Sequence, residues 1–133
     1  PENMQKGDLG YDDLMSDISA FLDERCRRAE LSGIPRNSLI LDPGVGFGKT
    51  YDDNCKIIYR LDELKGLGLP LLIGTSRKAF IGKITGGNPE ERLEGTAATV
   101  AAAIINGCHI VRVHDVAFMK RVAAMTDAIV QAA

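Results

Sequence analysis

The sequence predicts an α/β fold in which helices cover a parallel sheet. Three short apolar stretches suit buried strands, and each is followed by a stretch whose apolar residues recur at helical spacing. The stretches expected to form strands are residues 38–42, 70–74 and 109–113. Strands that alternate with helices are typical of parallel sheets, because each connection has to cross back over the sheet.

The chain opens with an expected helix that no strand precedes. Residues 11–31 have apolar side chains at helical spacing, and Gly33 and Pro35 suit the end of that helix. The units that follow suit either a doubly wound sheet or a (β/α)8 TIM barrel. A complete barrel needs roughly 200–250 residues, so the 133 residues here supply about half of one. We therefore expect an N-terminal part that lies outside this chain.

Capping residues indicate where the other helices begin. Asp52 or Asp53 is expected to cap a helix whose apolar stripe covers residues 57–64. Ser76 is the candidate cap of a short helix, and Asp115 can cap the last one. The later helices are expected at residues 79–84, 90–105 and 116–129.

The composition argues against several classes of protein. A net charge of -2 with scattered basic residues does not suit a nucleic-acid-binding protein. No apolar run approaches the ~20 residues of a membrane helix, and the polar opening lacks the apolar region of a signal peptide. Cys26, Cys55 and Cys108 are odd in number and widely spaced, which favours reduced core thiols over a disulfide or zinc framework. A cytoplasmic protein is expected.

Small residues gather on the helix expected at residues 90–105. Alanines surround Val100 on several faces. Close packing at a subunit interface would explain them, and so would the high helix propensity of alanine.

Charged side chains are expected at the C-terminal end of the last strand. Side chains alternate in direction along a strand, so Ile110, Arg112 and His114 should point the same way. This strand should be buried, and a buried guanidinium is costly without an anionic partner. Arg112 is therefore expected either to bind an anionic ligand or to form an internal salt bridge with a distant carboxylate.

The other chemically unusual residues also follow strands. Asp42 ends the first expected strand, and residues 76–78 (Ser-Arg-Lys) follow the second. Cations at the start of a helix oppose its dipole unless an anion binds there. Ligands of parallel α/β proteins bind at the C-terminal ends of strands. Together with Arg112 and His114, these residues predict a binding site at the C-terminal edge of the sheet.

The loop after Asp42 suits a flat ligand better than a nucleotide phosphate. A carboxylate can accept two parallel N–H bonds from a 2-amino-pyrimidinone edge, although Asp42 could instead cap a turn or pair with Lys49. Pro43 stands where a phosphate-binding loop needs glycine, and it lacks the N–H that would contact phosphate. Gly46 and its neighbouring glycines permit tight turns beside a ligand, with Phe47 as an apolar wall.

Four motifs in this order resemble the dihydropteroate synthase family of folate biosynthesis. They are Leu-Asp-Pro-Gly-Val-Gly-Phe-Gly-Lys at residues 41–49, Gly-Thr-Ser-Arg-Lys at 74–78 with Ile-Gly at 81–82, Gly-Thr-Ala at 95–97, and Arg-Val-His-Asp-Val at 112–116. The opening residues 1–5 are similar to the loop after the fifth strand of that family. The resemblance implies that residues 1–133 are the C-terminal portion of a single pterin-binding TIM-barrel domain, with its last three βα units and a preceding helix.

The resemblance implies a transferase that condenses 6-hydroxymethyl-7,8-dihydropterin diphosphate with p-aminobenzoate to give 7,8-dihydropteroate and diphosphate. Asp42 would hold the pterin edge, and Lys78 would contact the pterin beside the aminobenzoate. Arg112 and His114 would bind the leaving diphosphate, so these two and Lys78 are the expected catalytic residues. The p-aminobenzoate pocket would be lined by Ser76, Arg77 and Phe47, with Gly46 also at the substrates.

The resemblance further implies a Mg2+ ion, a homodimer and sensitivity to sulfonamides. The magnesium ligands are expected in the N-terminal part, with none in this chain, and the chain alone is expected to be inactive. Two alternatives remain open: a pterin-binding domain of a methyltetrahydrofolate methyltransferase, and a non-catalytic half-barrel that docks with a separate partner. A methyl transfer has no diphosphate to hold, so tight binding of diphosphate would distinguish a dihydropteroate synthase from the methyltransferase.

Overall fold

The computed structural model describes residues 2–133, with side chains described from Leu14 onward. The helices are α1 (Glu2–Leu31), α2 (Tyr51–Tyr59), α3 (Ala79–Thr85), α4 (Leu93–Ile105) and α5 (Val116–Gln131). The strands are β1 (Leu72–Ile73) and β2 (Ile110–Val111), and three 3-10 segments are η1 (Arg36–Ser38), η2 (Leu61–Leu67) and η3 (Pro89–Glu91).

The predicted parallel sheet is present but short. β1 pairs in parallel with β2, with Leu72 opposite Ile110. The first expected strand, residues 38–42, reduces to an isolated parallel bridge between Leu41 and Leu71, so β1 lies between that segment and β2. Each strand was predicted to have five residues. β1 and β2 have two residues each, so the predicted strand lengths were wrong. One cause is Pro43, which has no N–H with which to extend the pairing.

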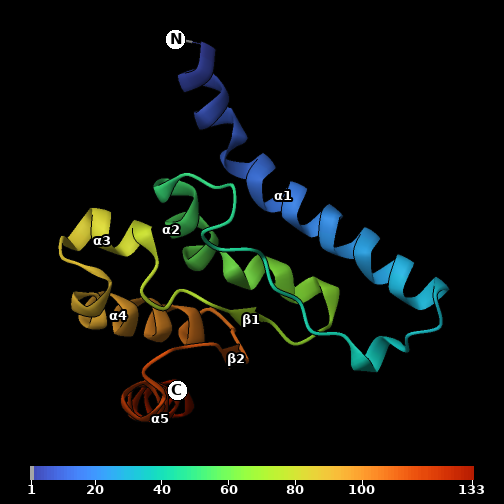
Figure 1. The fold of residues 1–133 in the computed structure, drawn as a ribbon. Helices are drawn as coiled ribbons and strands as arrows, with labels where there is room; N and C mark the ends of the chain where they lie inside the picture. The colour runs from blue at the N-terminus through green and yellow to red at the C-terminus, as the bar shows by residue number, and fades with distance from the viewer. Residues whose placement is uncertain (1) are drawn as a thin grey trace.

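Helices surround this small sheet (Figure 1). α1 runs along one side of the molecule, with α2 and η2 between it and the strands, while α4 and α5 pack against each other on the other side. The buried apolar core joins one face of α1 to α2, η2, β1 and α3. Its members are Met15, Ile18, Leu22, Cys26, Leu41, Val45, Ile57, Ile58, Leu61, Leu64, Leu71, Ile73, Phe80, Ile81 and Ala103.

Several helix boundaries differ from those expected. α1 begins at Glu2 rather than near residue 11, and α4 begins at Leu93 because residues 89–91 form a 3-10 turn. The apolar stripe of residues 57–64 is divided between α2 and η2.

Two predicted caps were wrong, and the third, Asp115, is right in position only. Thr50 caps α2, accepting from the Asp53 N–H in a reciprocal capping box. α3 has Lys78 at its cap position, because Ser76 binds His114 instead. Asp115 does precede α5, but its carboxylate makes no capping bond and pairs with Arg77.

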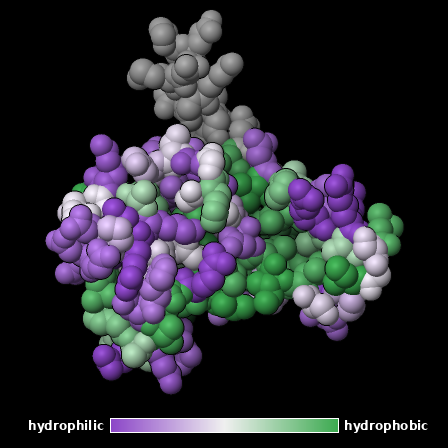
Figure 2. Space-filling model, in the orientation of Figure 1, coloured by the Kyte–Doolittle hydropathy of each residue, from purple (hydrophilic) through white to green (hydrophobic). Residues whose placement is uncertain are grey.

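The third strand is less buried than expected. Ile110 is 37% exposed, and Ile40, beside the first strand segment, is 53% exposed. Arg112 and His114 are exposed as well, so the predicted burial of this strand end was wrong for these described residues. Figure 2 shows hydrophobic residues at the surface across the middle of the face, below α1. A sheet with further strands would cover such positions.

The three cysteines are free thiols with different surroundings. Cys26 is buried in the core and Cys108 is half-buried, whereas Cys55 is exposed, so the expectation of a core thiol was wrong for Cys55. Burial raises the pKa of the Cys108 thiol. Among the helices that the structure describes, none combines the length and hydropathy needed to cross a membrane.

Candidate functional site

The C-terminal ends of β1 and β2 open into a cavity of about 380 Å³. Both strands point toward this edge because they are parallel, so the segments that follow them meet there. The cavity is lined by Gly74, Ser76, Lys78, Arg112, Val113 and His114. Four of the predicted site residues carry positive or protonatable groups, and the structure brings three of them, Lys78, Arg112 and His114, to one cavity.

Arg112 lies against the backbone of Gly74. Its N–H donates to the Ile73 carbonyl at 3.0 Å, which fixes the residue at the strand end. A Cβ placed on Gly74 would lie 3.0 Å from Arg112 Nη2 and 3.2 Å from Nε, so the glycine makes room for the guanidinium. Among the described residues no carboxylate forms a salt bridge with Arg112. The alternative of an internal salt bridge is therefore absent from this part of the chain, and the guanidinium can bind an anion.

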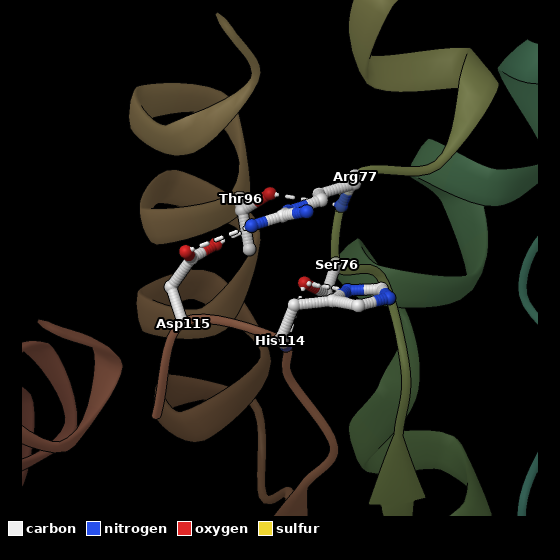
Figure 3. Close-up of polar contacts among 5 residues, drawn as sticks. All are labelled: Ser76, Arg77, Thr96, His114 and Asp115. Atoms are coloured by element: carbon white, nitrogen blue, oxygen red, sulfur yellow. Dashed lines mark hydrogen bonds and ion pairs between the residues drawn. The ribbon is translucent and has the colours of Figure 1, made fainter. Parts of the chain in front are cut away.

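Ser76 orients the imidazole of His114 (Figure 3). The Ser76 hydroxyl lies 2.7 Å from His114 Nδ1, and its oxygen accepts the His114 backbone N–H at 3.0 Å. Because that oxygen already accepts one hydrogen bond, the arrangement favours donation of its own hydrogen to Nδ1. A neutral imidazole would then carry its proton on Nε2. Nε2–H is a donor suited to an anionic ligand.

Lys78 connects the cavity to the glycine-rich loop, which is formed by residues 43–48. Its ammonium donates to the Val45 carbonyl and lies 4.7 Å from the centre of the Phe47 ring. Gly46 permits this approach, since a Cβ there would be 2.8 Å from Lys78 Cδ. Burial lowers the pKa of Lys78; the charge of Asp42 opposes this shift, and the charge of Arg112 adds to it.

The glycine-rich loop is held by side chains at its two ends and by a buried asparagine. Asp42 Oδ1 accepts the Gly44 N–H at 2.8 Å, so the turn-capping alternative is confirmed for one carboxylate oxygen. Lys49 donates to the Gly44 and Phe47 carbonyls at 3.1 and 3.2 Å rather than to Asp42. This use of Lys49 within its own loop differs from a phosphate-binding loop.

Asn54 supports the loop beside the cavity, and sequence reasoning missed it. It lies on α2, is only 2% exposed, and accepts the Gly46 N–H at 2.8 Å. A buried amide of this kind fixes the backbone of the loop. The available signal was a polar residue among the apolar positions of a helix that directly follows a glycine-rich loop.

Arg77 does not line the cavity. Its guanidinium pairs with Asp115, Nη2 lying 3.0 Å from Oδ1, and this carboxylate raises the pKa of Arg77. Figure 3 shows the Arg77 side chain directed toward Asp115 and α4, away from the Ser76 and His114 pair. Phe47 is exposed beside Lys78. The structure thus groups Ser76, Lys78, Arg112 and His114 and leaves Arg77 outside the group.

Comparison with known proteins identifies similar chains. The model of a family described as "Pterin binding enzyme" matches residues 1–114. The dihydropteroate synthase of Bacillus subtilis is 49% identical over 118 residues, which are 89% of this chain and 41% of that protein. A folic acid synthesis protein of Pneumocystis carinii is 48% identical over 122 residues, 88% of this chain and 16% of its own length.

Solved structures agree in fold. The dihydropteroate synthase of Yersinia pestis in complex with a sulfonamide drug has a TM-score of 0.89 and 38% identity, covering 92% of this chain and 44% of that one. The Xanthomonas albilineans dihydropteroate synthase with 7,8-dihydropteroate has a TM-score of 0.85 and 39% identity, covering 89% and 47%. The chain therefore spans less than half the length of these relatives.

Proposed function

This chain belongs to the family of pterin binding enzymes, and from that premise we propose that it is the C-terminal half of a dihydropteroate synthase. The amino nitrogen of p-aminobenzoate would attack the exocyclic methylene carbon of 6-hydroxymethyl-7,8-dihydropterin diphosphate. A C–N bond forms as the C–O bond to diphosphate breaks, and the nitrogen loses a proton. The names of the relatives, and the ligands bound in the solved structures, support this choice of reaction.

We propose that the architecture is the last part of one (β/α)8 barrel, with residues 1–133 inside a single domain. The parallel order of residues 38–42, β1 and β2 supports this architecture. So do the exposed Ile40 and Ile110, which further strands would cover. We use the term parent polypeptide for the longer protein that, in this proposal, contains both this chain and the preceding strands of the barrel.

The observation that carries the proposal is the meeting of Lys78, Arg112 and His114 at one cavity. The Arg112 guanidinium, the Lys78 ammonium and the imidazole donor of His114 provide the charge and the hydrogen bonds that a diphosphate leaving group needs. Stabilising that group as the C–O bond breaks favours a pterin cation, which a weak aniline nucleophile can attack. No protein nucleophile is required.

The other substrate contacts follow from neighbouring side chains. One Asp42 oxygen is used by Gly44, and the remaining carboxylate oxygen can accept from the pterin edge. The p-aminobenzoate would lie beside Phe47 and Ser76, next to the Lys78 ammonium. The Arg77 side chain pairs with Asp115, so no contact of this side chain with p-aminobenzoate is proposed.

The proposed reaction uses Mg2+, but the described residues do not form a site for it. No three His, Cys, Asp or Glu side chains are grouped as metal ligands in this part of the chain, and the cavity presents cations. On the resemblance to dihydropteroate synthases we propose that the magnesium ligands lie outside this chain, and no step above is assigned to the metal.

We also propose a cytoplasmic homodimer. The free cysteines support a reducing compartment. An apolar cleft of about 300 Å³ between α2, α3 and α4, with Tyr59 and Ile84 exposed beside it, supports a second copy as the occupant of that face. Sedimentation of the parent polypeptide should give a dimer, and Ile84→Glu should give a monomer. A dimer that survives this substitution would exclude this face.

Product formation from the two substrates tests the proposed activity. The parent polypeptide is expected to release diphosphate and form 7,8-dihydropteroate, and the isolated chain is expected to be inactive. Arg112→Met in the parent should lower kcat/KM by about tenfold to a hundredfold, the range for a lost charged hydrogen bond. The matched control is Arg27→Met, which removes an exposed arginine of α1. A parent polypeptide that binds pterin but not diphosphate would contradict the proposal and favour methyl transfer.

A further inference from the structure

Arg77 has a backbone conformation that its side chain does not favour. Its φ is +59°, and it is the only non-glycine residue with positive φ in the described part of the chain. The Lys78 N–H donates to the Thr75 carbonyl at 3.0 Å, so Arg77 is the third residue of a four-residue turn. A positive φ at that position usually requires glycine or asparagine. Some other part of the structure must therefore hold Arg77 in place.

Two residues at the start of α4 hold both backbone groups of Arg77. Thr96 is fully buried, and its Oγ1 accepts the Arg77 N–H at 3.2 Å (Figure 3). Arg92 Nη1 donates to the Arg77 carbonyl at 2.8 Å. Because the N–H and the carbonyl are held from the same helix end, the left-handed conformation is fixed from both sides.

The surroundings of Arg92 show that its position is maintained at a cost. Its Nε is buried and has no hydrogen-bond partner among the described residues. Its guanidinium lies against Gly82 of α3, where a Cβ would come within 2.7 Å of Arg92 Cζ. Glycine inside a helix costs about 1 kcal/mol relative to alanine. Gly82 has no positive φ to explain it, so the space that it leaves for Arg92 is its evident role.

We propose that Arg92 and Thr96 are positioning residues, which act on the cavity by holding Arg77 in its left-handed turn. The turn places Ser76 and Lys78, the two neighbours of Arg77, at the cavity and starts α3 at the next residue. If Arg77 relaxed to negative φ, the path of the backbone from Ser76 to Lys78 would change, and the ammonium would leave its place beside the Val45 carbonyl. This inference rests on the proposed function for its kinetic effect.

A double-mutant cycle in the parent polypeptide tests the inference. Arg92→Met removes the donor but keeps an unbranched side chain, and it should raise the KM for p-aminobenzoate about tenfold. Arg77→Gly removes the need for support, because glycine adopts positive φ without strain. In the Arg77→Gly background, Arg92→Met should change that KM by less than about twofold. Thr96→Val should show the same dependence on background, and Thr96→Ser should behave as wild type.

Hydrogen exchange over residues 74–80 provides a readout that needs no substrate. Exchange should rise in Arg92→Met, stay unchanged in the control Arg27→Met, and no longer respond to Arg92→Met when residue 77 is glycine. An equal effect of Arg92→Met in both backgrounds, or none in either, would overturn the positioning role. A wild-type parent polypeptide without synthase activity would overturn the proposed function instead, and the exchange data would still decide on Arg92.

Discussion

Substitution of Gly74 by alanine tests how Arg112 is seated at the cavity. Gly74 has no positive φ, so alanine adds no backbone strain there. The new Cβ would lie 3.0 Å from Arg112 Nη2 and 3.2 Å from Nε, closer than an ordinary contact. Arg112 has an exposed side chain, which can move away by about half an ångström. The substitution should therefore displace a charge while leaving the core intact.

The size of the effect follows from Coulomb's law. At an effective dielectric constant of about 20, two unit charges about 4 Å apart attract by about 4 kcal/mol, and half an ångström of extra separation removes about 0.5 kcal/mol. For about two charges on a bound diphosphate the loss is about 1 kcal/mol, or about fivefold in Kd. The expected change in unfolding free energy is below about 1 kcal/mol, since no core contact is lost.

Calorimetric titration of the parent polypeptide with diphosphate measures this change. Gly66→Ala is the matched control, because a Cβ at Gly66 meets nothing within 4 Å and its φ is not positive. The control should bind diphosphate as wild type does. Unchanged diphosphate affinity in Gly74→Ala would refute the placement of the anion beside Arg112. An equal loss of affinity in both variants would show a general effect of alanine and would also refute it.

Three further predictions concern the loop and its lysine. Asp42→Asn keeps an acceptor for Gly44 but removes the charge, so pterin affinity measured by fluorescence should fall at least tenfold; the same loss in the exposed control Asp62→Asn would contradict the assignment. Because burial lowers the pKa of Lys78, its ammonium loses its proton at lower pH than an exposed lysine. Diphosphate affinity should therefore weaken as the pH rises into the alkaline range, and Lys78→Arg should move that weakening to higher pH; identical pH profiles would refute this. Asn54→Ala should reduce the free energy of unfolding in urea by about 1–3 kcal/mol, whereas the exposed Asn37→Ala should have little effect, and equal midpoints would show that the bond to Gly46 contributes nothing.

The parallel sheet could be predicted because its evidence is local. Apolar stretches alternate with helical spacing, and that alternation leaves few topologies. Strand length could not be predicted in the same way, since it depends on partners that lie far along the chain or outside it. Leu41 illustrates this dependence, because it forms only a bridge to Leu71.

Helix starts were predictable in principle at one position. Thr50 and Asp53 form the sequence pattern of a capping box, and the structure contains both of its hydrogen bonds. Ser76 and Asp115 were good local candidates for caps, yet both side chains bind groups that are 38 residues away. Tertiary partners outweighed local preference at these two residues, and a single sequence does not show such partners.

The charged residues of the candidate site could be predicted, but the contacts that position them could not. Lys78, Arg112 and His114 follow strands, so their meeting at one edge follows from topology. The turn of Arg77 and its contacts to Arg92 and Thr96 join segments that no motif connects. The orientation of Arg77 toward Asp115 likewise depends on side-chain geometry that spacing does not specify.

A crystal structure of the parent polypeptide with diphosphate and a pterin tests the central claim most directly. The anion is expected against the guanidinium of Arg112, within hydrogen-bond distance of His114 Nε2 and near the Lys78 ammonium, with the pterin edge on Asp42. Diphosphate bound elsewhere on the protein, or an Arg112 side chain paired with a carboxylate while the cavity holds no anion, would contradict the account.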